Sequence, residues 1–171
     1  MILGMSVETF TLLHVLISLV GIASGLVVVF GLISAKTLPR WTATFLITTV
    51  LTSATGFLFP ISKLTPGLVV GVISMVVLAA AIAALYAFKL AGTWRWIYVA
   101  TATLALYLNV FVLIAQSFQK IPALHALAPT GKEPAFGIAQ LLNLAVFIVL
   151  GVLAEKGFRP RSQPAASAAK A

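Results

Sequence analysis

The feature that most constrains this chain is a series of long apolar segments that carry almost no charge. Hydrophobic residues make up 61% of the 171 residues and charged residues only 8%, a balance far outside the range of soluble domains. We predict five membrane spans, at about residues 10–34, 41–59, 66–90, 94–117 and 135–154. As helices they are roughly 28 to 37 Å long, enough to cross a hydrocarbon core of about 30 Å with some tilt. The runs are continuous and lack the alternation of a transmembrane β-barrel. The sequence therefore predicts an all-α, polytopic transmembrane helix bundle that occupies residues 1–156 as one domain.

The basic residues predict how the chain is threaded through the membrane. Eight fall on one predicted side and three on the other, and the side richer in Lys and Arg normally faces the cytoplasm. The first group is Lys36, Arg40, Lys89, Arg95, Lys156, Arg159, Arg161 and Lys170, and the second is Lys63, Lys120 and Lys132. We therefore expect the amino terminus outside and the carboxyl terminus in the cytoplasm. There residues 157–171, rich in Pro, Ala and Ser, are expected to form a disordered basic tail. Because the cations stand singly at the ends of apolar runs, the net charge of +8 does not indicate a nucleic-acid partner.

The second span is unusual because seven of the twenty residues 41–60 are Thr or Ser. At about 100° per residue, Thr44, Thr48, Thr52 and Thr55 form one stripe along the helix. A second stripe beside it holds Thr42, Thr49, Ser53 and Gly56. Lipid tails offer a hydroxyl no partner, so we expect this helix to face other helices or a wet cavity from the centre of the bundle.

Small residues in the other spans indicate close helix packing. Gly21 and Gly25 have the four-residue spacing that lets two helices approach closely, and they share a face with His14 and Ser18. The residues that we expect at helix contacts are Gly21, Gly25, Thr44, Thr55, Gly67, Gly71 and Ser74.

Of the amides in the last two spans, where an unpaired polar group is costly, three are candidate site residues. Asn109 belongs to the fourth span, and Gln140 and Asn143 belong to the fifth, where Gly151 lies near the same face. Two interpretations stay open. The amides form hydrogen bonds between helices, or they line a cleft for a headgroup or small neutral solute together with Thr48 and Thr52.

The two histidines are candidates for a third kind of site. His14 lies about one turn from the outer surface, and His125 lies in the loop 121–129, which we expect to form a short amphipathic helix in the membrane interface. Both fall on the outer side, where they would suit a quinone- or haem-linked accessory protein. The chain has no cysteine and no carboxylate cluster, so no metal site and no bound cofactor is predicted.

Residues 13–39 and 100–129, with the motif at 55–60 between them, resemble small uncharacterised multi-spanning integral membrane proteins of proteobacteria. That group has no assigned activity, so the resemblance transfers no functional residue. It implies a bacterial inner membrane as the location.

The predicted spans hold no Asp, Glu, Lys or Arg near their middle, where ion-coupled transporters usually need one. No titratable pair suggests acid–base catalysis either. The sequence therefore favours a non-enzymatic membrane protein, an oligomeric or accessory subunit held together by its small and hydroxyl residues. Its expected partners are the lipid bilayer and a second copy or a larger membrane complex. The alternatives are a binding or permeation protein for a small neutral or lipid-like ligand, and the redox accessory built on His14 and His125.

Overall fold

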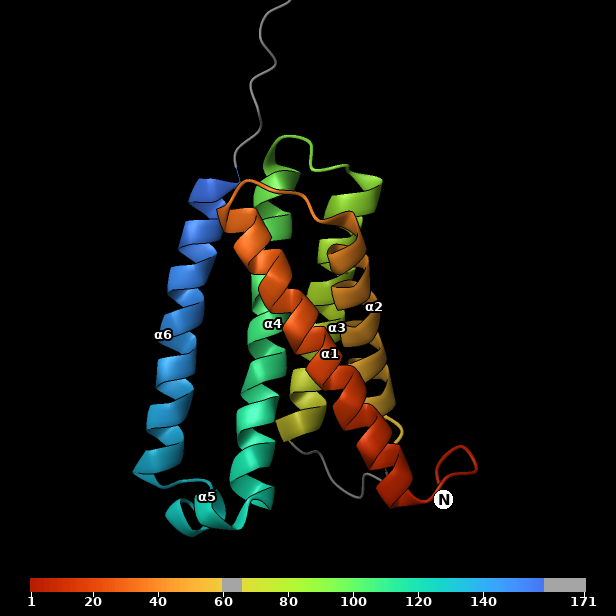
Figure 1. The fold of residues 1–171 in the computed structure, drawn as a ribbon, viewed down its shortest axis with the longest axis vertical. Coiled ribbons are helices and arrows are strands. Elements are labelled where there is room, and N and C mark those ends of the chain that lie inside the picture. The colour runs from red at the N-terminus through yellow and green to blue at the C-terminus, as the bar shows by residue number, and fades with distance from the viewer. Residues whose placement is uncertain (60–65, 159–171) are drawn as a thin grey trace, which may run out of the picture.

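The computed structural model describes residues 1–59 and 66–158, and within these ranges the chain is a bundle of helices without a strand (Figure 1). The elements are α1 (Val7–Ile33), α2 (Pro39–Gly56), α3 (Pro66–Ile82), the π-helix η1 (Ala83–Ala87), α4 (Thr93–Lys120), α5 (Pro122–Leu127) and α6 (Pro134–Gly157). The predicted all-α class is confirmed. The short helix expected in the loop 121–129 is present as α5.

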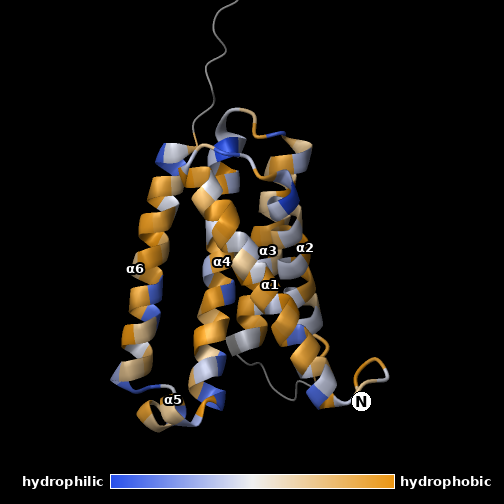
Figure 2. Cartoon of the chain, viewed as in Figure 1, coloured by the Kyte–Doolittle hydropathy of each residue, from blue (hydrophilic) through white to orange (hydrophobic). Residues whose placement is uncertain are grey.

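Four of the described helical segments are long and apolar enough to cross a membrane, namely α1, Gly67–Ala87, α4 and α6. Figure 2 shows apolar residues along most of the length of these helices. The protein is therefore a multi-pass membrane protein. The helix α2 has 18 residues, and its Thr and Ser residues make it less apolar than the other four. A fifth crossing by α2, and the direction in which the chain is threaded, stay predictions.

The helix at the centre of the bundle is α4, which contacts α1, α2, α3 and α6. The expectation that the Thr-rich helix would be central is wrong, because α2 packs mainly against α1 and α3. Two fully buried alanines of α4, Ala102 and Ala105, help explain the difference. Their small side chains let neighbouring helices approach α4 from several directions.

Glycine brings α1 against two partners at once. A Cβ at Gly25 would lie 2.7 Å from Leu106 Cδ1 of α4 and 2.8 Å from the Phe45 ring of α2. No side chain fits there without displacing one of these neighbours. The helix α1 therefore crosses obliquely over α4 with α2 beside it (Figure 1).

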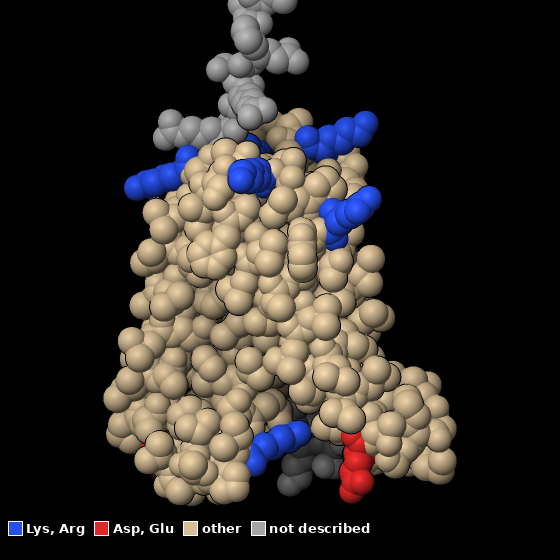
Figure 3. Space-filling view, viewed as in Figure 1, with Lys and Arg blue, Asp and Glu red and all other residues tan. Residues whose placement is uncertain are grey.

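The charged residues gather at the two ends of the bundle, as Figure 3 shows for one face. The basic end is the end that holds the α1–α2 connection, the start of α4 and the last turn of α6. Its described cations are Lys36, Arg40, Lys89, Arg95 and Lys156, whereas Lys120 and Lys132 lie at the opposite end.

The predicted tail 157–171 lies almost wholly outside the described residues. Its first two residues belong to the bundle, because α6 continues to Gly157 and the Phe158 side chain is buried against the core. The close contact of this turn with α1 involves backbone. A Cβ at Gly157 would lie 2.7 Å from the carbonyl carbon of Ile33 and 2.9 Å from its Cα.

Candidate ligand groove

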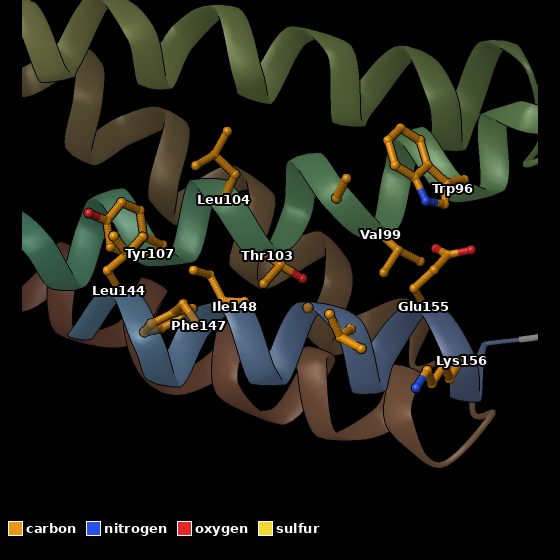
Figure 4. A pocket seen from close by; sticks show the side chains of 13 residues that line it. Trp96, Val99, Thr103, Leu104, Tyr107, Leu144, Phe147, Ile148, Glu155 and Lys156 are labelled. Atoms are coloured by element: carbon orange, nitrogen blue, oxygen red, sulfur yellow. The ribbon is translucent and has the colours of Figure 1, made fainter. Parts of the chain in front are cut away.

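A groove of about 420 Å³ runs between α4 and α6 (Figure 4). On each helix its lining residues recur at three- and four-residue spacing, so they form one stripe along each wall. The stripe on α4 runs from Trp96 to Tyr107, and the stripe on α6 runs from Leu144 to Lys156. Almost all of these side chains are apolar, and the charged ones, Glu155 and Lys156, stand at the basic end.

The groove exists because α4 and α6 touch at both of its ends and have small residues between. At one end the rings of Tyr107 and Phe147 meet edge to face, with centroids 5.8 Å apart. In the middle Gly151 faces Thr103, and even an added Cβ would lie at an ordinary 3.5 Å from Thr103 Cγ2. Because Gly151 has no side chain, the space beside it stays open.

The basic end is held by an ion pair that joins the same two helices. Arg95 Nη2 lies 3.3 Å from Glu155 Oε1, with side chains 22% and 28% exposed. Arg95 Nη1 also donates a hydrogen bond to the Phe158 carbonyl oxygen. The second carboxylate oxygen of Glu155 is buried and has no hydrogen-bond partner within residues 1–59 and 66–158. The guanidinium therefore ties the start of α4 to the last turn of α6.

The polar residues predicted to form a cleft do not line this groove. Two of them meet instead at a polar crossing of α1, α2 and α4, which consists of Ser18, Gly21, Thr48, Thr49 and Asn109. Ser18 Oγ donates to Asn109 Oδ1 over 2.9 Å. A Cβ at Gly21 would lie 3.2 Å from Asn109 Nδ2 and from both threonine hydroxyls. This geometry favours the interpretation of Asn109 as an interhelical hydrogen-bonding residue.

The Thr stripe of α2 satisfies its hydroxyls within its own helix. Thr48 Oγ1 donates to the Thr44 carbonyl over 2.7 Å, and Thr52 Oγ1 donates to the Thr48 carbonyl over 2.9 Å. Thr44 and Thr55 make the same bond to Arg40 and Leu51. Such bonds to the carbonyl four residues earlier need neither a partner helix nor a ligand.

The two amides of α6 lie outside the groove and face the bundle at other points. Gln140 Nε2 donates to the Phe111 carbonyl of α4 over 3.1 Å. Asn143 is buried. Each keeps one buried polar atom, Gln140 Oε1 and Asn143 Nδ2, without a hydrogen-bond partner in the described part of the chain.

The structure does not bring the two histidines into contact. His14 Nδ1 lies 2.8 Å from Thr55 Oγ1, and its ring meets Phe59 edge to face. The Thr55 hydroxyl also lies 2.7 Å from the Leu51 carbonyl oxygen of its own helix. His125 is exposed on α5, which packs against α4.

The remaining predicted contact residues lie as follows. Gly71 faces the Phe57 ring, where a Cβ would be 3.2 Å from Cζ. Ser74 is buried, and Gly67 is exposed at the start of α3.

Sequence reasoning missed the groove and its ion pair. The signal that was available is Gly151 between the bulky residues Leu150 and Val152, together with Glu155 as the only carboxylate near the basic end of a span. No family model, no curated protein and no solved structure matches this chain.

Proposed function

We propose that this membrane protein is a non-enzymatic binding protein for a lipid-like ligand whose apolar chain lies in the groove between α4 and α6. The observation that carries the proposal is the groove itself, because apolar walls run along its length and its charged groups stand at one end. A binding site of about 420 Å³ is within the usual range of 300–1,000 Å³ for small-molecule pockets.

The length of the groove supports a chain-like ligand. Its lining covers Trp96 to Tyr107 on α4 and Leu144 to Lys156 on α6. At 1.5 Å per residue these stretches are roughly 16 to 18 Å long, about half of a hydrocarbon core of roughly 30 Å. A chain whose polar head lies at the basic end therefore reaches the middle of the membrane.

The groove opens toward the bilayer, because large, apolar and exposed residues of α6 lie within its lining and beside it. They include Leu141, Leu142, Ile148, Val149 and Val152. A ligand dissolved in the lipid phase thus reaches the groove sideways, without crossing water.

That the protein is an oligomeric or accessory subunit, held to its partner by small and hydroxyl residues, remains a second prediction. The packing of these residues within the chain supports it less. Gly21, Gly25 and Ser74 are buried within the single chain, so they do not present a small-residue surface to a second copy.

We propose the bacterial inner membrane as the location, on the resemblance of residues 13–39 and 100–129 to proteobacterial membrane proteins.

Filling the groove tests the proposal. Gly151→Leu places a branched side chain in the open space, whereas Val149→Leu adds a methylene group on the exposed face of the same helix. Native mass spectrometry of protein released from gentle detergent should show a persistent lipid-like mass on the wild type and on Val149→Leu. We expect Gly151→Leu to retain it at least about tenfold less, a difference of about 1.4 kcal/mol. Both variants should keep the thermal stability of the wild type. Equal retention by Gly151→Leu and Val149→Leu would show that the ligand lies elsewhere.

A further inference from the structure

We infer that the ligand is an anionic phospholipid of the leaflet at the basic end, with one acyl chain in the groove and its headgroup at Lys156. This inference rests on the proposed function, because it names the ligand of the same groove.

The groove carries charged side chains at one end only. Glu155 and Lys156 lie at the basic end, and Trp96 beside them is 54% exposed. Tryptophan prefers the headgroup level of a membrane. The far end is walled by Tyr107, Leu144 and Phe147. An amphiphile in this groove therefore has its headgroup beside Trp96 and Lys156 and its chain end at the aromatic pair.

The charge at that end favours an anion. Five described cations stand there, namely Lys36, Arg40, Lys89, Arg95 and Lys156, against one described carboxylate, Glu155. The Glu155 charge is offset by Arg95, which lies 3.3 Å away. Lys156 is exposed and belongs to the lining of the groove. Its flexible ammonium group is suited to a phosphate at the level of the interface.

Arg95 fixes the two walls of the groove relative to each other at the basic end. Its guanidinium bonds both Glu155 and the Phe158 carbonyl, so α4 and α6 are held together directly above the apolar part. The chain of a phospholipid fits below this ion pair, and the headgroup meets Lys156 on the outer side. A soluble anion would be attracted by the cations at this end but would make no contact with the apolar walls of the groove.

The test uses purified full-length protein stripped of lipid and titrated in native mass spectrometry. The probes are dioleoyl phosphatidylglycerol and dioleoyl phosphatidylcholine, which share their chains and differ in headgroup charge. The wild type should bind the phosphatidylglycerol more tightly. Lys156→Gln should lower that preference about fivefold, the effect of one cation near an anionic surface. Lys89→Gln, which removes an exposed cation of the same end outside the groove, should keep it.

The outcomes separate the two proposals. If the wild type binds both lipids equally while Gly151→Leu still loses them, the headgroup inference is overturned and the groove remains a binding site. If Lys89→Gln loses as much preference as Lys156→Gln, the charge acts diffusely and the assignment to Lys156 fails. If Gly151→Leu binds both lipids like the wild type, only loosely bound bulk lipid was present and both proposals fail. A dimer mass that Gly151→Leu abolishes would show a second copy in the groove and would also overturn them.

Discussion

Gly157→Ala should lower the thermal unfolding temperature of the purified protein by several degrees. The added methyl carbon would lie 2.7 Å from the carbonyl carbon of Ile33 and 2.9 Å from its Cα. These are backbone atoms at the end of α1, so no rotation of a side chain relieves the contact. Overpacking of this kind typically costs about 1–3 kcal/mol.

The matched control is Gly137→Ala near the other end of the same helix. A Cβ there meets nothing within 4 Å, and alanine is favoured over glycine in a helix by about 1 kcal/mol. Its unfolding temperature in the same detergent should equal or exceed that of the wild type. If Gly157→Ala behaves like Gly137→Ala, α6 does not approach the backbone of α1 at this end.

The result bears on the groove as well as on stability. Phe158 follows Gly157 directly, and its carbonyl accepts the hydrogen bond from Arg95. Forcing the last turn of α6 away from α1 therefore moves the acceptor that positions this guanidinium. We expect Gly157→Ala to weaken the retention of an anionic lipid, even though its side chain does not line the groove.

The positions of the long helices could be predicted from the sequence because a membrane-length apolar run has one main way to satisfy its backbone. The ends of each predicted span lie within about three residues of the helical segments observed, including η1 as the end of the third. The central helix could not be predicted in the same way. Thr48 and Thr52 suggested a need for partners, but their hydroxyls bond carbonyls of their own helix. A count of polar residues does not distinguish these two arrangements.

The candidate groove was beyond the reach of sequence reasoning for a related reason. Apolar residues at three- and four-residue spacing describe a lipid-facing stripe as well as a groove-facing one. The sequence placed Gly151 near one face with Gln140 and Asn143. In the structure Gly151 lines the groove and the two amides do not. The difference depends on how α4 and α6 are rotated, which the contacts at Arg95 and Tyr107 help to set.

The contact of Gly25 with α2 and α4 predicts that a side chain at this position lowers the stability of the protein. Gly25→Ala puts a methyl carbon 2.7 Å from Leu106 Cδ1 and 2.8 Å from the Phe45 ring. Both neighbours are fully buried, so neither can turn away into lipid. We expect a loss of about 1–3 kcal/mol, measured as the free energy of unfolding in mixed micelles. Gly56→Ala is the control, since its nearest neighbour would be His14 Cε1 at 3.8 Å, and it should leave stability nearly unchanged.

A double-mutant cycle tests whether the clash with Leu106 is the cause. Leu106→Ala alone should cost about 2–5 kcal/mol, because it leaves a cavity between α1 and α4. In the double variant the new methyl group of residue 25 occupies part of that cavity, so its clash with Leu106 is gone while its close approach to the Phe45 ring stays. The double variant should therefore be more stable than the sum of the two losses predicts, with a coupling of about 0.5–3 kcal/mol. Additive losses would mean that Gly25 and Leu106 do not touch, and that α1 crosses α4 at a greater distance than this structure has it.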